Sequence, residues 1–154
     1  MARGDEGLTL IEMMVTLAII AIISGIAVLG IGSANRGATV QAEAQRLAGR
    51  LRLAADEVLV TRRSLALAAD RDSYGFVSRD AATGRWAPDK VGLLGERHRA
   101  PAAVQYVMPS TAPIALEPDG LGEPFVVVVS GRKDSWTVTY DGLNVVAAPA
   151  PGAS

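Results

Sequence analysis

The 154-residue chain contains no cysteine and a single histidine, His98. Without thiols there is no disulfide framework, no thiolate zinc site, no iron–sulfur cluster and no cysteine nucleophile. One imidazole is too few for a histidine-based metal site or a two-histidine relay. The 15 Lys and Arg residues nearly balance the 16 Asp and Glu residues, so the net charge of -1 does not indicate a protein that coats nucleic acid.

No other catalytic signature takes the place of these residues. Ser130 and Ser135 have no histidine near them in the sequence, and the chain has no G-x-S-x-G element. His98 stands in a charged stretch, where we expect an exposed loop residue. The acidic residues around Asp70 and Glu117 lack the spacing of a calcium loop and are typical of turns. The sequence therefore predicts a non-enzymatic protein with no catalytic residue, metal or cofactor.

Hydrophobic residues are concentrated near the N-terminus. Residues 13–32 form a run of 20 residues without a charge, about 30 Å long as a helix, which matches the hydrocarbon core of a bilayer. A membrane-spanning helix is the leading interpretation, and a secretory signal peptide cleaved near Ala42 is the alternative. Glu12, inside an otherwise apolar stretch, is a poor feature for the core of a signal peptide. A charge at membrane depth costs about 2.5–3.5 kcal/mol unless it finds a partner or reaches the headgroups, so we expect Glu12 to have a function.

A short polar leader, residues 1–7, is joined to this run by Gly7-Leu8-Thr9-Leu10-Ile11-Glu12. The arrangement resembles the N-terminus of type IV pilins and pseudopilins, in which a prepilin peptidase cuts after the glycine and methylates the new terminal amine. The resemblance implies cleavage between Gly7 and Leu8, N-methylation of Leu8, and pairing of Glu12 with the Leu8 amine of a neighbouring subunit during filament assembly. In the alternative, Glu12 only reaches the lipid headgroups.

The helical pattern continues beyond the apolar run. Apolar residues recur at intervals of four and three along one stripe, formed by Val40, Ala44, Leu47, Leu51, Ala54 and Val58. We expect one helix over residues 9–63, with a transmembrane half at 8–32 and an amphipathic half at 33–63. Five arginines lie largely off the stripe and are expected on a solvated face: Arg46, Arg50, Arg52, Arg62 and Arg63.

After residue 63 the apolar period changes towards two and turn residues become frequent. We expect strands over 65–69, 74–78, 85–87, 104–108, 125–130, 135–140 and 144–147, within a β-rich globular domain at 64–147. Residues 148–154 are expected to form a disordered tail, and residues 88–113 a variable, partner-facing segment. The predicted fold is α+β and pilin-like: a long N-terminal helix packs on an antiparallel β-sheet domain.

The globular part resembles the H-type minor pseudopilins of type II secretion systems, which are grouped with a related minor pilin of type IV pili. The landmarks are Trp86, Arg99-Ala100-Pro101, and a closing Trp136 hairpin followed by Asp141-Gly142. The resemblance implies a subunit that helps to start pseudopilus assembly near the tip and to drive export of folded proteins across the outer membrane. It implies a hetero-oligomeric filament with major and minor pseudopilins, processing by prepilin peptidase, and a single-pass inner-membrane anchor with the C-terminal domain in the periplasm.

Two other functions remain open from the sequence. The first is a minor pilin of a type IV pilus that takes up DNA, although 14 Lys and Arg against 13 Asp and Glu after Gly32 do not favour nucleic-acid binding. The second is a signal-anchored periplasmic binding module. That module would not be processed at Gly7 and would tolerate a change of Glu12.

Overall fold

The computed structural model describes residues 10–89, 92–117 and 123–152. Side chains of helical residues 11–22, and of the described residues from 39 onward, are part of this description. The chain divides into two compact units, residues 1–36 and 37–154, which we describe separately.

Helix α1 runs from Leu10 to Thr61, close to the expected bounds. It ends because Arg62 adopts a left-handed conformation (φ 54°) and donates its N–H to the carbonyl of Val58 at 2.9 Å. This is the usual way to satisfy a terminal helix carbonyl, although glycine fills the position more often than arginine. The Thr61 hydroxyl donates to the Glu57 carbonyl at 2.7 Å and satisfies a second terminal acceptor.

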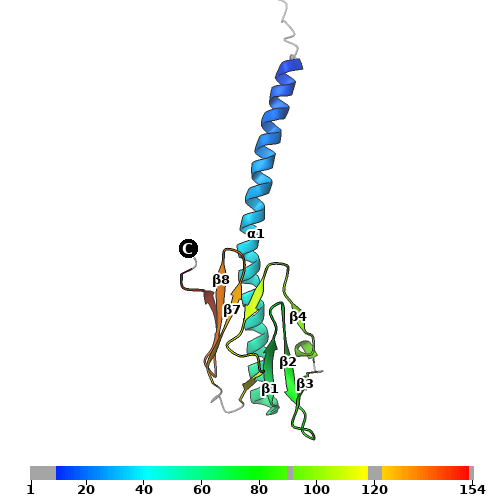
Figure 1. Cartoon of the computed structure of the whole chain (residues 1–154), viewed down its shortest axis with the longest axis vertical. Coiled ribbons are helices and arrows are strands. Elements are labelled where there is room, and N and C mark those ends of the chain that lie inside the picture. Colours follow the sequence, from blue (N-terminus) through cyan, green and yellow to red (C-terminus); the bar gives the residue numbers. More distant parts are fainter. Residues whose placement is uncertain (1–9, 90–91, 118–122, 153–154) are drawn as a thin grey trace, which may run out of the picture. The chain divides into compact units, whose positions relative to one another are not determined.

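Two antiparallel sheets follow α1 in the second unit (Figure 1). The first has the order β3-β2-β1-β6, and β4 also pairs with β2. Its strands are β1 (Leu65–Ala69), β2 (Ser73–Arg79), β3 (Trp86–Pro88), β4 (His98–Arg99) and β6 (Ile114–Leu116). The second has the order β5-β7-β8-β9. Its strands are β5 (Gln105–Val107), β7 (Phe125–Ser130), β8 (Ser135–Tyr140) and β9 (Val145–Pro149).

The strand predictions are confirmed for all seven expected segments, within one or two residues at each end. Two strands were not expected, β4 and β6, because two or three residues are too few to show a periodic pattern. The prediction for the tail was wrong at its start. Ala148 and Pro149 belong to β9, where they pair with Thr137 and Trp136 of β8.

The strands form two separate sheets, whereas we expected a single antiparallel sheet. The backbone N–H of Tyr106 in β5 donates to the carbonyl of Arg71, in the turn between β1 and β2, at 2.8 Å. The segment 88–113, expected to be variable and partner-facing, contains the expected strand β5 and also β4 and the short 3₁₀ helix η1 (Gly92–Leu94). Such pairing joins residues far apart in the chain, which local patterns do not reveal.

The hydrophobic core of the second unit lies between α1 and the two sheets. All six residues of the predicted apolar stripe are at most 2% exposed. They pack against inward-facing residues of both sheets, including Leu65, Phe76, Val127, Val138 and Tyr140. Strand β7 is central in its sheet, as its valine run predicted.

Candidate functional site

The residues expected to carry processing and assembly lie at the N-terminus. Gly7 and Leu8 fall outside the described residues. Glu12 lies in the first turn of α1 and its side chain is exposed. The Thr16 hydroxyl donates to the carbonyls of Glu12 and Met13, both at 3.0 Å, so this polar group is satisfied within the helix.

The first unit presents apolar side chains around the helix. Eight large hydrophobic residues between Ile11 and Ile22 are each more than half exposed: Ile11, Met13, Met14, Val15, Leu17, Ile19, Ile20 and Ile22. In the part of the chain that the structure describes, no helix meets the length and apolarity needed to cross a membrane. The transmembrane assignment of residues 8–32 stays a prediction.

A polar cluster joins α1 to the sheets in the second unit. Glu43, on the buried face of α1, is only 4% exposed. Its Oε2 accepts a hydrogen bond from the Tyr106 hydroxyl at 2.9 Å and lies 2.6 Å from His98 Nε2. Its Oε1 lies 3.5 Å from the guanidinium of Arg46. A buried carboxylate needs such partners, because an unpaired charge in the interior costs several kcal/mol.

Aromatic rings surround this cluster. The ring of Tyr74 lies 5.2 Å from that of His98 and meets that of Tyr106 edge-on at 5.1 Å. Burial, reinforced by the Glu43 carboxylate, raises the pKa of the Tyr106 hydroxyl far above its usual range, so the hydroxyl remains a donor to Glu43. Burial likewise raises the pKa of Tyr74.

The expectation for His98 was therefore wrong. His98 belongs to β4 and is largely buried, with 17% of its side chain exposed. Glu43 was not among the residues predicted from the sequence. Its helical phase was the available signal, since it follows Val40 by three positions and precedes Leu47 by four, which places it on the apolar stripe.

The arginines of α1 are likewise not a simply solvated face. The Arg50 guanidinium lies 5.3 Å from the ring centre of Tyr74 and donates to the backbone carbonyls of Leu93 and Glu96. Arg52 donates from Nη2 to the carbonyl of Val145 in β9 at 2.6 Å. These bonds attach the helix to the segment that contains η1, between β3 and β4, and to the edge of the second sheet.

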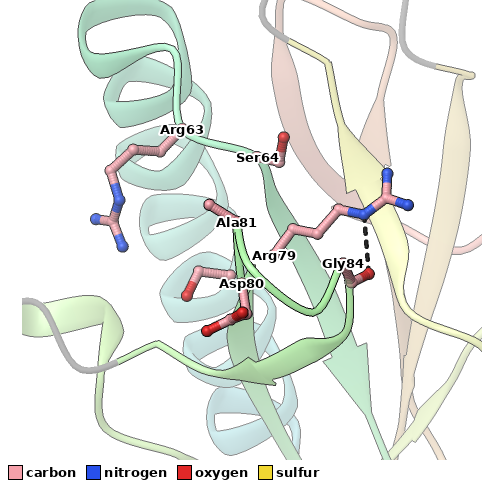
Figure 2. A pocket seen from close by; sticks show the side chains of 7 residues that line it. Arg63, Ser64, Arg79, Asp80, Ala81 and Gly84 are labelled. Carbon is pink, nitrogen blue, oxygen red and sulfur yellow. Dashed lines mark hydrogen bonds between the residues drawn. The ribbon is translucent and has the colours of Figure 1, made fainter.

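A depression of about 610 Å³ lies where α1 ends and the β2–β3 hairpin begins (Figure 2). Arg79 crosses it and donates from Nε to the carbonyl of Gly84 at 3.0 Å. At its border, Arg63 forms an ion pair with the buried Asp89 at 2.7 Å. The backbone N–H of Thr83, which donates to Asp80, lowers the pKa of that carboxyl group. These contacts order the hairpin.

Two of the acidic residues considered as calcium ligands form ion pairs, and Asp119 lies outside the described residues. Asp70 pairs with Arg97, and Asp72 pairs with Arg99 at 3.0 Å. Among the described residues, no three His, Asp or Glu side chains are gathered as metal ligands.

Comparison with known proteins assigns the family. The prokaryotic N-terminal methylation motif matches residues 2–33. The type II secretion system protein H of Pseudomonas aeruginosa is 35% identical over 133 residues, which cover 86% of this chain and 69% of that protein. The chain belongs to the type II secretion system protein H family.

The fold agrees with this family membership. Two solved structures of the minor pseudopilin EpsH from the type 2 secretion system of Vibrio cholerae match the chain with TM-scores of 0.61 and 0.59, at 18% and 17% identity. They cover 74% and 77% of this chain and 98% of each solved chain. The expected α+β pilin-like fold and the resemblance to H-type minor pseudopilins are both confirmed.

Proposed function

We propose that this protein is a minor pseudopilin subunit of the type II secretion pseudopilus, where it helps to start assembly near the tip and to drive export. The observation that carries the proposal is the 35% identity to a type II secretion system protein H. The match extends over 133 residues, which is longer than either unit, so it includes parts of both. The methylation motif at residues 2–33 and the pilin-like fold support the same function.

The apolar start of α1 supports a membrane or filament environment. Burying one large aliphatic side chain is worth about 1.5–3 kcal/mol, and eight such side chains between Ile11 and Ile22 are exposed in the isolated chain. We infer that this segment resides in the inner membrane before assembly and in a bundle of pseudopilin helices afterwards. The globular unit then lies in the periplasm, with other pseudopilins as its partners.

Processing by a prepilin peptidase would complete the assembly site. A cut between Gly7 and Leu8 leaves a mature chain of 154 − 7 = 147 residues and creates an N-methylated α-amine at Leu8. In a medium of low dielectric constant, a positive amine and the Glu12 carboxylate attract strongly. A Glu12 from one subunit paired with the Leu8 amine of the next would offset the cost of burying either charge and set the axial register.

The test combines secretion with intact mass. In a strain lacking this gene, we expect secretion of the system's cargo to stop and the wild-type chain to restore it. Glu12→Ala should restore it poorly, whereas Glu96→Ala, which removes an exposed carboxylate of the globular unit, should restore it fully. Normal secretion in the deletion strain would contradict the proposed function.

The same strains report on processing. In the membrane fraction, we expect the chain to lose residues 1–7 and gain one methyl group only when prepilin peptidase is present. An uncut chain, or cleavage near Ala42, would contradict the assignment of Gly7 and Leu8.

A further inference from the structure

The outward face of the second sheet carries no charged residue in its two central rows. The register aligns Val107, Val128, Thr137 and Ala148 in one row across the four strands. It aligns Val126, Thr139 and Val146 in the next. The valines at 107, 126 and 146 are 54%, 42% and 56% exposed, while the alternate residues of these strands face the core.

An exposed sheet face of this composition is unusual. The solvated face of an antiparallel sheet commonly carries polar residues, in alternation with apolar residues that face the core. Seven positions, each about 4.8 Å by 6.8 Å on one face of the sheet, cover roughly 230 Å², which approaches the size of the largest apolar patch on a typical monomer. We name these seven residues the valine face.

An apolar depression extends the valine face at one end. It has a volume of about 530 Å³, and Val126 and Thr139 belong to both features. Pro109, Ile114 and Pro124 supply much of the remaining wall, and Glu123 lies at its border. A flat face with an apolar hollow beside it is suited to accept a protruding side chain from another protein.

The two ends of the valine face carry opposite charges. The β7–β8 turn holds Arg132 and Lys133 against one acid, Asp134. The opposite ends of the same strands adjoin Glu123 and Asp141. A partner that covers the whole face must therefore offer carboxylates at the first end and a basic group at the second.

A second copy of this chain fits these charges only if its strands run antiparallel to the first. The basic turn lies where α1 enters the unit, because a Cβ on Gly131 would come within 2.6 Å of Val40 Cγ2. In an antiparallel pair the points at which α1 enters the two globular units would lie at opposite ends of the shared face, whereas neighbouring subunits of one filament are expected to receive α1 at the same end. The charge pattern thus selects a different chain with parallel orientation.

We propose that the valine face docks the globular domain of a different pseudopilin, which presents an uncharged surface flanked by an acidic and a basic group. The inference rests on the proposed function, and it assigns the partner-facing surface to the second sheet, whose valine face includes Val107 of the segment 88–113 predicted from the sequence. The inner face of this sheet is buried under α1, so the valine face is the surface that the second sheet offers to a neighbour.

Photocrosslinking in cells tests the contact. A benzoylphenylalanine replaces Thr139 in the full chain, and a control chain carries it at Ala87, an exposed position of β3 in the first sheet. We expect an adduct at position 139 whose mass identifies another pseudopilin, and little or none at position 87. An adduct of twice the chain's own mass, equal adducts at both positions, or no adduct at 139 would overturn the proposal.

A charge placed on the valine face tests its importance. Because an unpaired charge buried in an interface is strongly unfavourable, we expect Thr139→Lys to reduce secretion in the complemented deletion strain by about tenfold or more. Ala87→Lys should restore secretion as the wild type does. If deletion blocks secretion but Thr139→Lys restores it fully, the docking proposal fails while the proposed function stands; normal secretion in the deletion strain instead removes the function itself.

Discussion

Glu43 is the one acidic side chain among the described residues of α1 that packs into the core of the second unit. Its carboxylate is held by groups from two strands, Tyr106 of β5 and His98 of β4, and by Arg46 of its own helix. A hydrophobic residue there would pack without these requirements. The cluster instead holds α1 in one position relative to both sheets, because a shift of the helix would leave the buried Glu43 carboxylate without its hydrogen-bond partners.

Replacing this carboxylate should destabilise the protein. Glu43→Ala leaves the Tyr106 hydroxyl and the His98 imidazole without their partner, and we expect the free energy of unfolding to fall by about 3–5 kcal/mol. Gln45→Ala, an exposed neighbour on the same helix, should change it by less than about 0.5 kcal/mol. Urea unfolding of the full chain in detergent measures both, and equal effects would contradict a structural role for the cluster.

At the scale of elements, the hairpin β7–β8 depends on a glycine for a reason that the sequence does not show. The sequence predicts a turn at residues 131–134, and the Gly131 N–H donates to the Asp134 carbonyl at 2.8 Å. The requirement for glycine comes from α1, since a Cβ at this position would lie 2.6 Å from Val40. The turn and the helix are therefore fitted to each other.

Gly131→Ala should overpack this contact and lower the free energy of unfolding by about 1–3 kcal/mol. Gly49→Ala is the matched control, because a Cβ there meets no atom within 4 Å and alanine favours a helix by about 0.5–1 kcal/mol. We expect thermal unfolding to shift down for the first variant and up for the second. Adding Val40→Ala to Gly131→Ala should recover part of the loss; no recovery would contradict the steric cause.

The helix and the long strands were predictable because each has a periodic pattern of its own. The six stripe residues from Val40 to Val58 are all buried as expected, and β7 and β8 have the expected bounds. The roles of Arg50, Arg52 and His98 were not predictable. Each acts through a contact with residues more than 40 positions away, and such contacts leave no local pattern.

For the molecule as a whole, the sequence indicated the family more clearly than it indicated the interface. The N-terminal motif around Gly7 and Glu12 has a fixed spacing, so it could be recognised from the sequence alone. The valine face is assembled from four strands between residues 105 and 149, and each contributes only one or two of its residues. These residues become neighbours only through the pairing register of the four strands, which the sequence does not show.

The margins of the second sheet have a further consequence for a chain with four consecutive valines. β9 ends with Pro149, which has no N–H to donate, and Arg52 occupies the Val145 carbonyl. On the other side, the Tyr106 N–H of β5 is taken by Arg71. Each of these features removes a backbone group that an incoming strand could pair with, and each therefore lowers the tendency of this valine-rich sheet to add strands and form cross-β aggregates.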